Sequence, residues 1–135
     1  MSANPSTIAT APALVAVIDA DATTRERVRM LLEPLPVEVH TFGSAAAFLR
    51  SLRDETPSCV IAEATMADMD GIMLLGELKR RGLDSATILL SRNEDIPFAV
   101  AAMRAGAVDF IEKPYIDRAL LHHVGHLVMA GQEPH

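Results

Sequence analysis

Four polar side chains end apolar segments of the chain, and their types suit phosphoryl and cation chemistry. They are Asp19, Glu63, Ser91 and Lys113, at the ends of the runs ALVAVID, SCVIAE, ATILLS and VDFIEK. Two carboxylates, a hydroxyl and an ammonium are groups that hold a divalent cation and phosphoryl oxygens. The four can act together only if the fold brings these segment ends to one place.

Apolar patterning predicts a strand followed by a helix five times over. The expected strands are 13–19, 37–42, 58–63, 86–91 and 108–114, and the expected helices are 22–33, 44–54, 71–82, 96–106 and 117–131. This alternation predicts an α/β three-layer fold: a five-stranded parallel sheet with five helices on its two faces. In the strand order 2-1-3-4-5, a crevice opens between the carboxyl ends of strands 1 and 3. Asp19 and Glu63 then flank this crevice, with Ser91 and Lys113 on the same rim. The alternative is that all four are ordinary polar residues at strand ends.

The helix ends and faces can also be predicted. Thr23 or Thr24, Ser44 and Asp117 are the expected N-caps of three helices. One face of the helix over 96–106 is expected to pack against the core, and it carries Ile96, Ala99, Val100 and Met103.

Composition limits the possible functions. The 135 residues carry a net charge of −6, which argues against nucleic-acid binding. The single cysteine, Cys59, excludes an internal disulfide, lies in an apolar run and favours a packing role in a cytoplasmic protein. We expect no signal peptide and no membrane span. The predicted organisation is a flexible tail over 1–12, one domain over 13–130 and a short tail over 131–135.

Several segments together resemble the response-regulator receiver domain, the CheY-like family, over about residues 13–128. The segments are VIDADATTR, MADMDG, AMRAGAVDFIEKPY and EDIPFAVAAMRAGAVDF, the last of which is similar to the FixJ-like branch. The resemblance implies a bacterial two-component protein located in the cytoplasm. In this family an aspartate at the end of strand 3 accepts a phosphoryl group from a histidine kinase. Two acids after strand 1 help to bind magnesium, and a Ser or Thr and a Lys hold the phosphoryl oxygens.

Matched position by position, the resemblance implies a degenerate phosphorylation site. The acceptor position holds Glu63, and the second of the two acids is replaced by Ala20. Ser91 and Lys113 match the family, and Phe110 matches its aromatic switch position.

Two further positions depart from the pattern. Arg92 stands where the family prefers a small residue, and Ala67 replaces a proline of the acceptor loop.

These departures have physical consequences for the metal and the acceptor. Magnesium requires near-octahedral oxygen ligands, so binding by Asp19 and Glu63 should be weak or lost without an acid at Ala20. Asp21 lies one residue further on and is the alternative acid of the pocket. The extra methylene of Glu63 displaces its carboxylate by about 1.5 Å, and a misplacement of about 1 Å can cost ~10²-fold in rate. We therefore expect no enzyme activity beyond weak autophosphorylation.

Two hypotheses describe the state of this site. In one, Glu63 pairs with Lys113 or Arg92, and a built-in ion pair fixes one state of the switch. In the other, the site has decayed and Glu63 is simply solvated.

The most favoured function is phosphorylation-independent signalling by protein–protein contact. By resemblance, the partner is a histidine kinase or an output protein, bound through the helix over 96–106, the last strand and the last helix. A homodimer is a further alternative. One alternative is a working phosphoacceptor receiver, excised from a FixJ-like DNA-binding response regulator. A remote alternative is a flavodoxin-like nucleotide-binding protein, which the lack of a glycine-rich phosphate loop and the five aromatic residues disfavour.

Two charged groups are weighed separately. His122 and His126 have a spacing that can hold a metal, and His123 lies beside them, but a solvated helix face is the favoured interpretation. The basic run at residues 79–81 is interpreted as helix-end charges rather than as a DNA-binding patch.

Overall fold

Five parallel strands form the sheet predicted from the sequence. The computed structural model describes residues 12–92, 95–113 and 116–132. The strands are β1 (Ala13–Ile18), β2 (Val37–Phe42), β3 (Cys59–Glu63), β4 (Ala86–Ser91) and β5 (Asp109–Glu112). Their order is β2-β1-β3-β4-β5, which confirms the predicted order 2-1-3-4-5.

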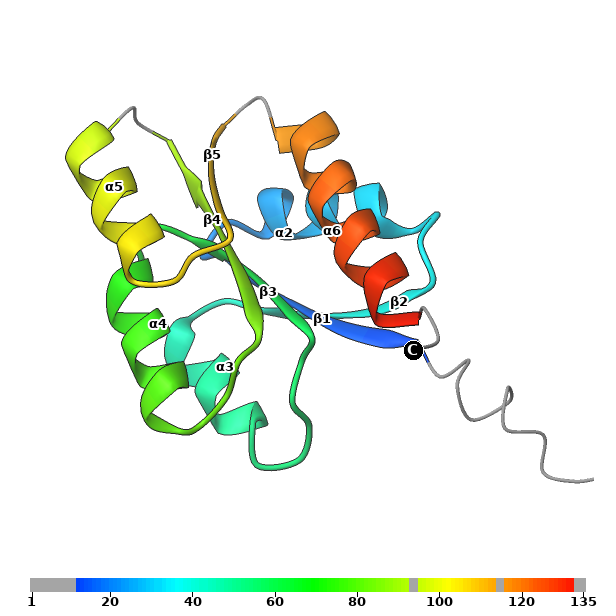
Figure 1. Ribbon diagram of the computed structural model, residues 1–135, viewed down its shortest axis with the longest axis horizontal. Coiled ribbons are helices and arrows are strands. Elements are labelled where there is room, and N and C mark those ends of the chain that lie inside the picture. The colour runs from blue at the N-terminus through cyan, green and yellow to red at the C-terminus, as the bar shows by residue number, and fades with distance from the viewer. Residues whose placement is uncertain (1–11, 93–94, 114–115, 133–135) are drawn as a thin grey trace, which may run out of the picture.

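Helices cover both faces of the sheet and complete the three layers (Figure 1). The helices are α2 (Ala22–Leu32), α3 (Ala45–Ser51), α4 (Gly71–Arg80), α5 (Ile96–Arg104) and α6 (Ile116–Gln132). α3, α4 and α5 pack on one face, and α2 and α6 pack on the other. Within the described residues, no helix has the length and apolar character needed to cross a membrane.

The predicted tails fall mainly outside the described part of the chain. Residues 1–11 and 133–135 lie outside it, as do residues 93–94 and 114–115. α6 continues to Gln132, which is past the predicted domain boundary at residue 130.

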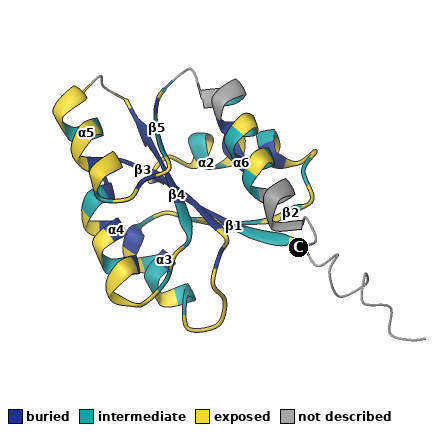
Figure 2. Ribbon diagram, in the orientation of Figure 1, coloured by how far each residue is buried: buried dark blue, intermediate teal, exposed yellow. Residues whose placement is uncertain are grey.

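The sheet divides the apolar core into two clusters. Ala16, Ile18 and Phe48 belong to the cluster under α3, α4 and α5, whereas Val17 and Leu120 belong to the cluster under α2 and α6. Alternate strand residues serve opposite faces, so a strand buried on both sides is apolar throughout. β3 is buried along its whole length, which is visible as dark blue in Figure 2.

Cys59, at the start of β3, is one of the buried core residues. Its burial raises the pKa of the thiol to about 12, because a thiolate would lose its hydration there. The packing role predicted for this cysteine therefore fits its environment.

The N-caps are only partly as predicted. Ser44 caps α3 by accepting a hydrogen bond from the amide of Ala47, as expected. The cap of α2 is Asp21, whose side chain accepts from the amide of Thr23, so the prediction of Thr23 or Thr24 is wrong. Asp117 lies in the first turn of α6 instead of capping it.

The prediction of the buried face of α5 is wrong. Ile96, Val100 and Met103 are exposed, and Ala102 is completely buried. Phe98 packs against the core beside Ala102. α5 has apolar residues on two faces, and the smaller side chain of Ala102 lies against the sheet. The larger aliphatic residues are therefore left on the outer surface, which is mostly exposed in Figure 2.

Candidate functional site

The strand register brings the four polar side chains to one edge of the sheet. Ile18 of β1 lies beside Ala62 of β3, so Asp19 and Glu63 follow as neighbours. Ser91 ends β4, and the amide of Lys113 donates to the carbonyl oxygen of Ser91 at 2.7 Å. Parallel strands place their carboxyl ends on one side, and open sheets bind ligands there.

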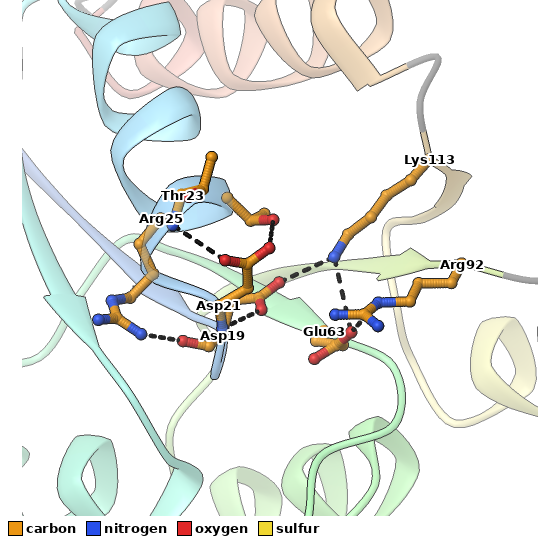
Figure 3. A network of polar contacts seen from close by, with 8 residues as sticks. Asp19, Asp21, Thr23, Arg25, Glu63, Arg92 and Lys113 are labelled. Carbon is orange, nitrogen blue, oxygen red and sulfur yellow. Dashed lines mark hydrogen bonds and ion pairs between the residues drawn. The ribbon is translucent and has the colours of Figure 1, made fainter.

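The ammonium of Lys113 lies between two carboxylates (Figure 3). Nζ is 3.0 Å from Oδ2 of Asp19 and 3.6 Å from Oε1 of Glu63. The side chain of Asp19 is 1% exposed and those of Glu63 and Lys113 are 10% and 15% exposed, so water screens these contacts little. Lys113 thus pairs more closely with Asp19 than with Glu63, which was its expected partner.

Arg92 adds a second cation at the outer side of the same group. Its Nε lies 3.2 Å from Oε1 of Glu63, while most of the Arg92 side chain is exposed. Asp19 and Glu63 therefore meet Lys113 and Arg92, and the four side chains together carry equal numbers of acidic and basic groups.

A pocket of about 330 Å³ opens beside this group. Glu63, Thr65, Ser91 and Arg92 line it. Thr65, two residues after the acceptor position, is the wall residue that we did not predict. The pocket combines a carboxylate, two hydroxyls and a guanidinium, which suit a small polar ligand such as a phosphoryl group.

Asp21 does not join the acidic pair. Its carboxylate accepts from the amide of Thr23 at 3.0 Å and from the hydroxyl of Thr24 at 3.0 Å, and these hydrogen bonds lower the pKa of Asp21. Its own amide donates to Oδ1 of Asp19 at 2.9 Å. One carboxylate oxygen of Asp19 therefore accepts from a backbone amide, and the other accepts from Lys113. The side chain of Asp21 points toward the helix instead (Figure 3).

Arg25 supports the end of β1 from α2, a role that no motif in the sequence indicates. Its guanidinium donates to the carbonyl oxygen of Asp19, away from the pocket (Figure 3). This contact fixes the backbone that carries Asp19.

Two hydrogen bonds hold the end of the loop after Glu63 at the start of α4. Asp70 caps α4 by accepting from the amide of Met73 at 2.8 Å. The amide of Gly71 donates to Ala64 at 2.7 Å, and a Cβ at Gly71 would lie 2.6 Å from the side chain of Leu89. The glycine is thus required because α4 begins directly against the sheet.

Asp68 ties the same loop to α3. Its carboxylate accepts from the amide of Ala46 at 2.8 Å, and this hydrogen bond is the main reason why the pKa of Asp68 is lowered. The acids at 68 and 70 therefore position the loop rather than enter the pocket.

This arrangement does not fit a magnesium ion of the kind that the family resemblance implies. Both carboxylate oxygens of Asp19 already accept hydrogen bonds, and Ala20 supplies no side-chain ligand. The ammonium of Lys113 lies within 4 Å of the carboxylates of Asp19 and Glu63. Magnesium needs nearly octahedral oxygen ligands and loses its waters reluctantly. The chemistry of this site is therefore that of an ion-pair group beside a polar pocket.

Phe110 lies away from the pocket, at the boundary between β5 and α5. Its ring is half-buried and 5.8 Å from the ring of Phe98. A shallow cavity of about 480 Å³ lies at this boundary, with a wall that includes Val100, Met103 and Phe110.

The charged groups weighed from the sequence take ordinary surface positions. His122 and His126 stack with ring centroids 6.2 Å apart on the exposed side of α6. Nε2 of His123 lies 2.5 Å from Oδ2 of Asp109 in β5. This acidic partner was not predicted, because it lies 14 positions earlier in the chain. In the basic run, Arg81 pairs with Glu77 of its own helix at 2.9 Å, as helix-end charges do.

Comparisons with known proteins agree with one family. The family model described as "Response regulator receiver domain" matches residues 15–125. The transcriptional regulatory protein FixJ of Azorhizobium caulinodans is 40% identical over 107 residues, which cover 79% of this chain and 51% of that protein.

Solved structures give the same result. A response regulator receiver protein from Pseudoalteromonas atlantica superposes with a TM-score of 0.80 at 38% identity, covering 87% of this chain and 98% of that one. Full-length FixJ from B. japonicum gives 0.80 at 34% identity, with coverages of 90% and 60%. The chain spans about half the length of the curated relatives that it matches.

Proposed function

Because the chain belongs to the response regulator receiver domain family, we propose that it is an atypical receiver that signals by protein contact without being phosphorylated. The observation that carries this proposal is the position of Lys113 between Asp19 and Glu63. In this proposal the ammonium supplies the positive charge that magnesium supplies in other receivers.

Charge balance supports a site that needs neither magnesium nor phosphate. With Ala20 in place of an acid, Asp19 and Glu63 are matched by Lys113 and Arg92. A pair of unit charges 4 Å apart attracts by about 4 kcal/mol at an effective dielectric of 20, and desolvation offsets part of this. The ion pairs thus fix one arrangement of the strand ends.

The partner surface in this proposal is formed by α5, β5 and α6. Ile96, Val100, Met103 and Val108 are exposed apolar side chains on or next to α5. Such residues are uncommon as a group on a monomer surface and are typical of protein contact sites. The partner is a histidine kinase or an output protein, in keeping with the family, and no nucleic acid is bound by this domain.

A second candidate function is phosphate transfer through Glu63. The pocket beside Glu63, with the hydroxyls of Thr65 and Ser91, favours it because it has room for a phosphoryl group. The exposed position of Arg92 would let that side chain move away from the pocket.

Phosphorylation by acetyl phosphate separates the two candidates. The wild-type protein, incubated with acetyl phosphate and magnesium, should gain no phosphoryl group by intact-protein mass spectrometry. The double variant Ala20→Asp, Glu63→Asp should gain one, which shows that the assay works on this fold. A wild-type protein phosphorylated at Glu63 would refute the proposed function.

Partner capture tests the signalling surface. Wild-type protein should capture its partner from native cells without phosphorylation, and Val100→Asp should not. Met73→Asp, at an exposed apolar position of α4 outside the proposed surface, is a matched control that should retain the partner. Capture that depends on phosphorylation of the wild type would contradict the proposal.

A further inference from the structure

A second group of ligand-type side chains lies far from the strand-end pocket. Among the residues that the structure describes, Glu38, His40 and Glu55 each place one ligand atom within 4.8 Å of the others. All three side chains are between one-third and about one-half exposed, so an ion from solution can reach them. This group lies toward the amino ends of β2 and β3, on the opposite rim from Asp19 and Glu63.

The fold explains why these three residues meet. Glu38 and His40 are two residues apart on β2, so they point to the same face of the sheet. β2 is the edge strand of the sheet, and the side chains of Glu38 and His40 are partly exposed to solvent there. Glu55 lies in the turn after α3, where its amide donates to the carbonyl oxygen of Ser51.

Each nitrogen of the His40 ring faces a different carboxylate. Nε2 lies 2.6 Å from Oε2 of Glu38, which is a short hydrogen bond. Nδ1 lies 3.5 Å from Oε1 of Glu55, which is too long for a good hydrogen bond. The two sides of the ring therefore have different geometry.

The longer distance matches the spacing of two ligands on one ion. Zinc binds imidazole nitrogen at about 2.0–2.1 Å and carboxylate oxygen at about 2.0–2.2 Å. In a tetrahedral site these bond lengths place the two ligand atoms about 3.4 Å apart. Nδ1 of His40 and Oε1 of Glu55 are separated by nearly this distance.

The shorter contact matches the arrangement around metal-bound histidines. A ligating imidazole usually donates its other N–H to a carboxylate, which fixes the tautomer and the ring orientation. Glu38 is placed to accept that hydrogen bond from Nε2.

We propose that this group is a surface site for a divalent cation of the zinc class. His40 and Glu55 are the direct ligands, Glu38 orients the imidazole, and water completes the coordination. Imidazole disfavours magnesium and calcium, which prefer oxygen ligands. The bound ion would join the edge strand β2 to the turn between α3 and β3. The site is independent of the proposed signalling function.

Zinc titration of the untagged, chelator-treated full chain tests the proposal by isothermal calorimetry. Wild type should bind one zinc ion in this site. His40→Gln and Glu55→Gln should each weaken that binding at least about tenfold, and Glu38→Gln should weaken it by about tenfold through the loss of ring orientation. Magnesium chloride should give no comparable heat.

The histidine pair on α6 provides the matched control. His122 and His126 have a spacing that can also hold zinc, so the double variant His122→Gln, His126→Gln should keep the proposed site intact. If zinc binding disappears in that double variant and persists in His40→Gln, the proposal is overturned. Absence of saturable zinc binding by the wild type would overturn it as well.

Thermal unfolding gives a second readout that also checks folding. In chelator, wild type and His40→Gln should unfold at similar temperatures, because His40 lies at the surface. Zinc should raise the unfolding temperature of wild type and not that of His40→Gln. An equal rise in both proteins would contradict binding at His40.

Discussion

Lys113 donates a hydrogen bond to Asp19 with 3.0 Å between Nζ and Oδ2, although 94 positions of the chain separate the two residues. The contact joins the segment after β5 to the end of β1, two strands that are not neighbours in the sheet. It therefore bridges the rim across β3 and β4, and Glu63 lies within reach of the same ammonium. The contact thus places one ammonium next to carboxylates at the ends of two different strands.

Removal of the Lys113 ammonium should destabilise the fold. Lys113→Ala leaves Asp19 as a buried carboxylate without its ion-pair partner, while Glu63 keeps Arg92. We expect a loss of about 3 kcal/mol in the free energy of unfolding, the lower end of the range for breaking a buried pair. Urea unfolding at neutral pH measures it. The control Arg92→Ala removes a mostly exposed charge and should cost less than about 1 kcal/mol. Equal effects of the two variants would contradict the central role of Lys113.

Magnesium should not stabilise the wild-type protein. Lys113 already lies between the two carboxylates, and Ala20 supplies no ligand. Ala20→Asp restores a third carboxylate, and its unfolding free energy should rise by about 1.4 kcal/mol when free magnesium exceeds the dissociation constant about tenfold. Thermal unfolding with and without magnesium checks this. Ala20→Asn has a similar shape without the charge and should show no rise; stabilisation of the wild type by magnesium would refute the prediction.

Two glycines of α4 should respond to alanine in opposite directions. At Gly71 a Cβ would lie 2.6 Å from Leu89, so Gly71→Ala should destabilise the protein by about 1–3 kcal/mol through overpacking. At Gly76 no atom lies within 4 Å of the added Cβ, so Gly76→Ala should stabilise the helix by up to about 1 kcal/mol. Chemical denaturation measures both changes. The same sign at the two positions would contradict the close approach of α4 to β4.

Asp68 should make the protein more sensitive to acid. The hydrogen bond from the amide of Ala46 holds the pKa of Asp68 in the folded state below its value in the unfolded chain, so the ionised form stabilises the fold. This contribution is fully present above the unfolded pKa and is lost as the pH falls through the folded pKa.

Unfolding curves between neutral pH and pH 3 test this expectation. Asp68→Asn should be less stable than wild type at neutral pH, and the difference should shrink as the pH falls below about 4. Asp84→Asn, at an exposed carboxylate in another loop, is the matched control. A difference for Asp68→Asn that stays constant across this range would show that the loss is not electrostatic.

The strand order and most element positions could be predicted because they follow from local patterns. The ranges 37–42 and 86–91 agree with β2 and β4 at both ends. The face of α5 could not be predicted in the same way, because the helix has apolar residues on more than one side: Ile96 is exposed, whereas Ala102 is buried. Periodicity cannot choose between two apolar faces, and the choice depends on which side chains fit close to the sheet.

For the site, the sequence predicted the right side chains on one rim and the pairing of Glu63 with Lys113 or Arg92, but not the contact between Lys113 and Asp19. The closest acidic partner of Lys113 is Asp19 rather than Glu63. Which carboxylate the ammonium contacts depends on the backbone positions at the ends of the strands, and sequence patterns do not give these positions. Likewise, with Thr23 or Thr24 expected as the helix cap, the sequence left Asp21 as the alternative acid of the pocket. Its position at the start of α2 made it a cap.

Because the sheet separates the two apolar clusters, a mutation in one cluster should change stability almost independently of a mutation in the other. Phe48 lies in one cluster and Leu120 in the other, with the strands between them. Losses of stability from truncating both side chains should therefore add to within about 0.5 kcal/mol, as for separated sites. Evolution can consequently alter the packing beneath α3, α4 and α5 while the packing beneath α2 and α6 stays as it is.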